Sequence, residues 1–132
     1  MPGFHKLHKL VTEHYSIGLV TASPRHNLNW LQTLINLDEL FEHIISGDET
    51  KKNKQHPEPY LVMMEKLNVK PENVVVIEDS LHGIQAALAS GAAVIAKTGS
   101  VPESDLSIAH RIITHLDEIT HNMIENLLQG DK

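Results

Sequence analysis

The segment Val74–Gly91 constrains the fold most strongly, because a run of β-branched residues passes directly into a helix-like pattern. Its first four residues are apolar without alternation, which is typical of a strand covered on both faces in a parallel sheet. Ser80 can cap the helix that follows, and Gly91 can end it. The segment therefore predicts a strand over residues 73–78 and then a helix, which is the repeating unit of an α/β fold.

The same alternation of strand and helix patterns continues along the chain. Helical spacing begins near Phe4, at Ser23-Pro24, after Pro57, after Ser80 and at Leu116, from which one amphipathic helix to Leu128 is predicted. The predicted strands cover residues 16–22, 41–46, 73–78, 93–97 and 110–114. Strands that alternate with helices form right-handed βαβ crossovers. We therefore predict one domain over residues 1–132, with a doubly wound, mostly parallel sheet between two layers of helices.

Composition excludes several classes of partner. The net charge of −6 leaves no basic stripe for nucleic acid, and the absence of cysteine excludes disulfides and thiolate metal sites. No apolar run approaches the roughly 20 residues that span a bilayer, and no export signal opens the chain. The ten histidines form no H-E-x-x-H pattern and are interpreted as surface residues. We expect a cytoplasmic protein that binds neither membranes nor nucleic acid.

Polar residues collect where the predicted strands end. The first strand ends in Thr21, Lys54 lies in the loop after the second, and the third ends in Glu78 and Asp79. Open α/β sheets bind ligands outside the carboxyl ends of their strands. A hydroxyl and an ammonium suit a phosphate group, and two carboxylates suit a hard cation such as Mg²⁺. Each signal also has a structural alternative, since Thr21 can bond locally and Lys54 can belong to a solvated charged loop.

Three segments in this order resemble a known family. They read G-L-V-T-A-S, then K-Q-H-P-E-P-Y, then V-V-V-I-E-D-S-L-H-G-I-Q-A-A-L-A-S-G-A. They are similar to motifs II, III and IV of the haloacid dehalogenase superfamily, in its branch of β-phosphoglucomutase-like phosphatases. The resemblance runs from about residue 2 to about residue 119. It implies the Rossmann-like, three-layer core of that superfamily.

The resemblance implies a phosphate-binding set of residues. Thr21 takes the role of the hydroxyl that binds the transferring phosphoryl group, and Ala22 and Ser23 add backbone N–H groups. Lys54 takes the role of the lysine that balances charge on the nucleophile and the phosphate. The resemblance therefore predicts a small phosphorylated metabolite as substrate.

The resemblance also implies a metal site. Asp79 is similar to the family's Mg²⁺ ligand, and Glu78 supports the metal or its waters. The family often has Gly before and Pro after the motif III lysine, where this chain has Asn53 and Gln55. That departure loosens the loop but leaves the lysine in register.

Two parts of the family pattern are missing from these residues. Related enzymes attack phosphate with the first aspartate of a D-x-D pair that follows the first strand, in two-step nucleophilic catalysis. The aspartates of this chain stand at positions 38, 48, 79, 105, 117 and 131, so no two are two residues apart. We therefore expect an incomplete core that lacks the first strand, motif I and the cap domain, with an open slot beside the strand of Asp79.

Two functional hypotheses follow. In the first, the complete parent is a Mg²⁺-dependent hydrolase or mutase that forms an aspartyl-phosphate, and this chain is inactive alone. In the second, the chain is a non-catalytic module that keeps a phosphate or metal pocket or binds a partner. Self-association, or pairing with a missing N-terminal segment, would fill the open slot. A receiver-like or nucleotide-binding domain is disfavoured, because the chain has no glycine-rich phosphate loop.

Overall fold

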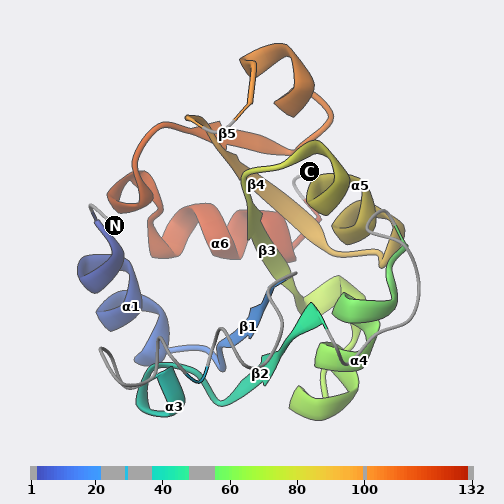
Figure 1. Ribbon diagram of the computed structural model, residues 1–132. Helices are drawn as coiled ribbons and strands as arrows, with labels where there is room; N and C mark the ends of the chain where they lie inside the picture. The colour runs from blue at the N-terminus through green and yellow to red at the C-terminus, as the bar shows by residue number, and fades with distance from the viewer. Residues whose placement is uncertain (1–2, 22–28, 30–36, 48–55, 100, 131–132) are drawn as a thin grey trace.

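The computed structural model describes residues 3–21, 29, 37–47, 56–99 and 101–130 (Figure 1). Its strands are β1 (Gly18–Val20), β2 (His43–Ile45), β3 (Val75–Glu78), β4 (Ala93–Lys97) and β5 (Arg111–Ile113). Its α-helices are α1 (Phe4–Thr12), α3 (Leu37–Leu40), α4 (Glu58–Leu67), α5 (Leu81–Ala89) and α6 (His121–Leu128). Short 3₁₀ helices are η2 (Pro71–Asn73), η3 (Glu103–Leu106) and η4 (Leu116–Glu118). The helix predicted from Ser23-Pro24 falls largely outside the described residues.

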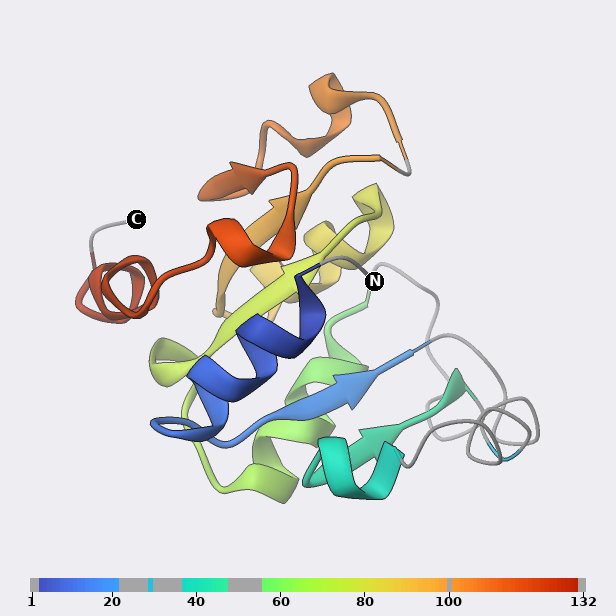
Figure 2. The same ribbon diagram turned by 90° about the vertical axis from the view of Figure 1, so that its left-hand side faces the viewer.

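The described strands form two parallel sheets. One sheet pairs β1 with β2, and the other has the order β3-β4-β5. Figure 2 shows β1, β2 and β3 running in the same direction, so their C-terminal ends face the same side of the molecule. No backbone ladder joins β1 to β3 among the described strands. The two strands therefore do not close up on each other, although their carboxyl ends share one side.

Helices cover both faces of the three-stranded sheet, as an α/β fold requires. Helices α4 and α5 lie on one face, and α1 and α6 lie on the other (Figure 1). The core on the first face contains Tyr60, Met64, Val76, Ile84, Ala86, Ala87, Ala92, Val94, Ala96 and Leu106. The core on the second contains Leu7, Val11, Ala93, Ile95, Ile113, Leu116, Ile119, Ile124 and Leu127. The three-layer, mostly parallel α/β class is confirmed.

Strands β3 and β4 differ in burial. Strand β4 is buried on both faces, since Val94, Ile95 and Ala96 are each 0% exposed. The apolar run predicts the same for β3, but its Ile77 is 39% exposed. Among the described strands β3 pairs only with β4, so β3 is an edge of its sheet in that part of the chain.

One predicted helix cap is confirmed, and one predicted helix is wrong. Ser80 caps α5 as predicted, with its Oγ accepting a hydrogen bond from Gly83 N at 3.1 Å. The single helix predicted over residues 116–128 is wrong, because it is divided into η4 and α6. Ile119 and Thr120 are β-branched and extended, and the Thr120 side chain accepts from Met123 N to start α6 anew.

Candidate functional site

The acidic pair lies at the C-terminal end of β3. Glu78 is the last residue of that strand and is half-buried, whereas Asp79 follows it and is exposed. Ser80 then starts α5, so the two acids occupy the turn between a strand and a helix. This is the edge at which parallel sheets bind ligands. We refer to residues 78–80 as the acidic turn.

The carboxylate of Glu78 is held by three hydrogen bonds. Its Oε2 accepts from the hydroxyl of Tyr60 at 2.6 Å. Its Oε1 accepts from Asp79 N at 3.0 Å and from Ser80 Oγ at 3.3 Å. The Glu78 carboxylate therefore turns back toward its own backbone, where it holds the peptide N–H of Asp79.

The hydrogen bond from Tyr60 to Glu78 was not predicted from the sequence. The helical spacing places it on the apolar face of α4, and its side chain is 8% exposed in the first turn of that helix. Burial, followed by the nearby Glu78 carboxylate, raises the pKa of Tyr60, so its hydroxyl stays protonated and donates. A buried tyrosine hydroxyl normally needs a hydrogen-bond partner. A tyrosine on the apolar face of a predicted helix was therefore the one sign in the sequence that such a partner exists.

Gly83 gives the Glu78 carboxylate its space. A Cβ built at Gly83 would overlap Cδ and Oε2 of Glu78. Glycine normally weakens a helix, so an isolated glycine in a helical pattern indicates a packing or functional requirement. Here the first turn of α5 has no side chain at position 83 because the Glu78 carboxylate fills that volume.

The phosphate-binding residues inferred from the sequence are described only in part. Thr21 directly follows β1, and its N–H donates to Ile45 O at 3.0 Å. Its place after a strand agrees with the predicted one, on the same side of the molecule as the acidic turn (Figure 2). Ala22, Ser23 and Lys54 lie outside the described residues. Their roles, and those of Thr21, Glu78 and Asp79, stay predictions.

The donor chemistry of the acidic turn fits Mg²⁺. This ion takes oxygen ligands and is usually bound by one or two carboxylates, with waters and substrate phosphate completing the shell. Asp79 and Glu78 supply adjacent carboxylates at an exposed sheet edge. In the part of the chain that the structure describes, no group of three or more His, Cys, Asp or Glu residues is placed to hold a metal.

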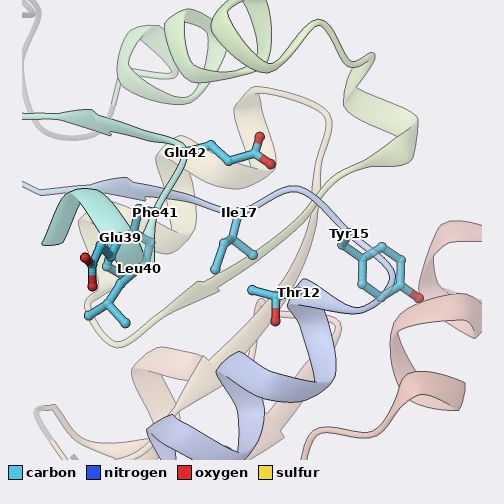
Figure 3. Close-up of a pocket in the computed structure, with 7 residues that line it drawn as sticks. All are labelled: Thr12, Tyr15, Ile17, Glu39, Leu40, Phe41 and Glu42. Carbon is cyan, nitrogen blue, oxygen red and sulfur yellow. The ribbon is translucent and has the colours of Figure 1, made fainter. Parts of the chain in front are cut away.

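A pocket of about 240 Å³ lies elsewhere, near the N-terminal ends of β1 and β2 (Figure 3). Its lining contains Thr12, Tyr15, Ile17, Glu39, Leu40, Phe41 and Glu42. It is open and mixed in polarity, and it shares no residue with the acidic turn. This pocket therefore lies apart from the acidic turn, which is the candidate site because of its sequence pattern and its place at the C-terminal end of β3.

Comparison with known proteins identifies the family and the fold. Residues 3–97 match the family model described as haloacid dehalogenase-like hydrolase. A phosphorylated carbohydrates phosphatase of Thermotoga maritima is 35% identical over 91 residues, which are 68% of this chain and 42% of that protein. This chain thus spans less than half the length of that curated relative.

Two solved structures share the fold over most of the chain. β-Phosphoglucomutase from Clostridium difficile superposes with a TM-score of 0.84 at 24% identity, over 99% of this chain and 57% of that one. CbbY from Rhodobacter sphaeroides, solved in complex with xylulose-(1,5)bisphosphate, gives a TM-score of 0.80 at 26% identity, over 89% and 54% of the two chains. None of the described helices is long and apolar enough to span a membrane.

Proposed function

Because this chain belongs to the haloacid dehalogenase-like hydrolase family, in its phosphoglucomutase-like branch, we propose that it carries the phosphate- and cation-binding part of a phosphatase site. The observation that supports this most directly is the acidic turn, where the Glu78 carboxylate is held by hydrogen bonds and the exposed Asp79 directly follows the carboxyl end of β3. The substrate class is a small phosphorylated metabolite. The names of the phosphorylated carbohydrates phosphatase and of the CbbY complex support that class.

Each residue has a role in this proposal. Asp79 would hold Mg²⁺, and Glu78 would support the ion or its waters. Bound Mg²⁺ would neutralise the charge of the phosphoryl oxygens. Thr21 would donate a hydrogen bond from its hydroxyl to the phosphoryl group, Ala22 and Ser23 would add backbone N–H donors, and Lys54 would balance the remaining negative charge. The attacking aspartate, which would form the aspartyl-phosphate, has no counterpart in these 132 residues, since they contain no D-x-D pair.

Binding of inorganic phosphate tests the proposal without requiring turnover. We expect calorimetry to detect phosphate binding in the presence of Mg²⁺ and much weaker binding without it. Asp79→Asn removes the charge that holds the cation while keeping the size of the side chain, so the Mg²⁺-dependent affinity should fall at least about tenfold. Asp117→Asn, at an exposed acid in η4, is the matched control and should leave the affinity unchanged. Equal phosphate affinity in wild type and Asp79→Asn would refute the assignment.

Turnover tests the second part of the proposal. We expect the 132-residue chain to release no p-nitrophenol from p-nitrophenyl phosphate with Mg²⁺, because it lacks a D-x-D nucleophile. The control is the Asp79→Ala variant, prepared in the same way. Activity that persists in that variant identifies a contaminant, whereas activity that it abolishes shows that the chain is catalytic by itself.

A non-catalytic role is the second candidate, and the absence of a D-x-D pair favours it. In that case the acidic turn and Thr21 would bind phosphate or a cation without chemistry, or the open edge of β3 would bind a partner or a second copy of the chain. Tight phosphate binding together with no turnover, even when the missing strand is supplied as part of a longer protein, would support this role.

A further inference from the structure

Tyr60 connects α4 to the acidic turn through a single short hydrogen bond. The distance of 2.6 Å between its hydroxyl and Glu78 Oε2 lies in the range of bonds from O–H donors to ionised acceptors. The bond joins residues 18 positions apart in the chain. Helix α4 also contacts β1, β2 and α5, so Tyr60 anchors the acidic turn to an element that packs against the other sheet.

The hydrogen bonds continue from Glu78 to the exposed acid. Glu78 Oε1 accepts from the backbone N–H of Asp79 and from Ser80 Oγ, and that same Oγ accepts from Gly83 N. The Asp79 backbone is therefore held through Glu78, which is itself held by Tyr60. Partners beyond the direct ligands of a metal commonly orient those ligands and strengthen binding.

We propose that Tyr60 is a positioning residue for the cation site, which orients Asp79 through the Glu78 carboxylate. This inference rests on the proposed function, since it assumes that Asp79 binds the cation. Tyr60 also has a plain packing role, because its ring lies in the same core as Met64, Val76 and Ile84. The hydroxyl is what distinguishes the two roles, and phenylalanine keeps the ring while removing it.

The test measures affinity for Mn²⁺, added alone as a spectroscopic substitute for Mg²⁺, by electron paramagnetic resonance. We compare wild type, Tyr60→Phe, Asp79→Asn and Tyr15→Phe. Tyr15→Phe is the matched control, because the Tyr15 hydroxyl also makes side-chain contacts, among them His121 Nδ1 at 3.1 Å, on the other face of the sheet. We expect Tyr60→Phe to weaken Mn²⁺ binding about tenfold, as is typical when such a supporting partner is removed. Tyr15→Phe should bind as wild type does.

The outcomes separate the inference from the proposal beneath it. If Asp79→Asn loses affinity and Tyr60→Phe does not, the positioning role is overturned and the cation site remains. If Asp79→Asn binds as tightly as wild type, the cation site itself is overturned, and the role of Tyr60 with it.

Amide hydrogen exchange gives a second readout that packing alone would not change. Tyr60→Phe should accelerate exchange at Asp79 N, whose acceptor is Glu78 Oε1, while the amides of β4 keep their protection. In a Glu78→Gln background the Tyr60→Phe change should have little further effect on either measurement, since the two residues act as one unit. Additive losses of Mn²⁺ affinity in the double variant, or an unchanged Asp79 amide in Tyr60→Phe, would overturn the inference.

Discussion

Gly83→Ala is expected to destabilise the protein by about 1–3 kcal/mol, the usual range for overpacking a filled site. The new Cβ would overlap Cδ of Glu78, so the carboxylate must shift from its place, and this strains its hydrogen bond with Tyr60. The sign of the effect is informative, because glycine to alanine inside a helix ordinarily stabilises by roughly 0.5–1 kcal/mol. Urea denaturation measures the change in the free energy of unfolding.

Two controls accompany this experiment. His82→Ala, at the exposed neighbouring position of α5, should change stability by less than about 0.5 kcal/mol. In a Glu78→Ala background the volume beside Gly83 is empty, so Gly83→Ala should no longer destabilise. A Gly83→Ala variant that is as stable as wild type, and that binds Mn²⁺ equally well, would contradict the described placement of the Glu78 carboxylate.

Ile95→Ala is expected to lower the free energy of unfolding by about 2–5 kcal/mol, the range for a large side chain deleted from a core. Ile95 is 0% exposed in β4, the central strand of the three-stranded sheet, and it packs in the core beneath α1 and α6. Because Ile95 is fully buried, we expect the surrounding side chains to relax only partly into the cavity that the substitution leaves. In urea denaturation the midpoint should move to a lower urea concentration, while the slope should stay unchanged.

Ile112→Ala is the matched control for Ile95→Ala. It deletes the same atoms from the adjacent strand β5, but Ile112 is already 38% exposed. Its cost should therefore stay below about 1 kcal/mol, since surface changes away from the core are small. Equal losses at the two positions would show that the core is not centred on β4.

The order of strands and helices was largely predictable from local patterns. The strand predicted over residues 93–97 coincides with β4, because a short apolar run, here four residues before Lys97, is typical of a buried strand. The Ser80 cap was also predictable, since one serine at a strand-to-helix junction carries the signal. The break between η4 and α6 was not, because apolar periodicity continues across Ile119 and conceals it.

For the candidate site, too, part could be predicted from the sequence and part could not. The sequence singles out Asp79 because a carboxylate directly after a predicted buried strand is costly unless it is paired or holds a cation. In the structure Asp79 does follow β3 but is exposed, and its role stays a prediction. The roles of Tyr60 and Gly83 could not be predicted, because both depend on where the Glu78 side chain turns after folding. Tyr60 is distant from Glu78 in sequence, and Gly83 matters only through a side chain that it does not itself possess. These contacts belong to tertiary structure, and no local pattern encodes them.

The absence of a backbone ladder between the two described sheets has a consequence for geometry. Ladder hydrogen bonds fix the offset of neighbouring strands in whole-residue steps, whereas apolar contacts are non-directional and adjust continuously. Thr21 follows one sheet and Asp79 follows the other, and α4 packs against strands of the first and against α5. Helix α4 therefore contacts both sides of the candidate site, because its Met63 sulfur lies against Gly18 of β1 and its Tyr60 hydroxyl donates to Glu78 at the end of β3.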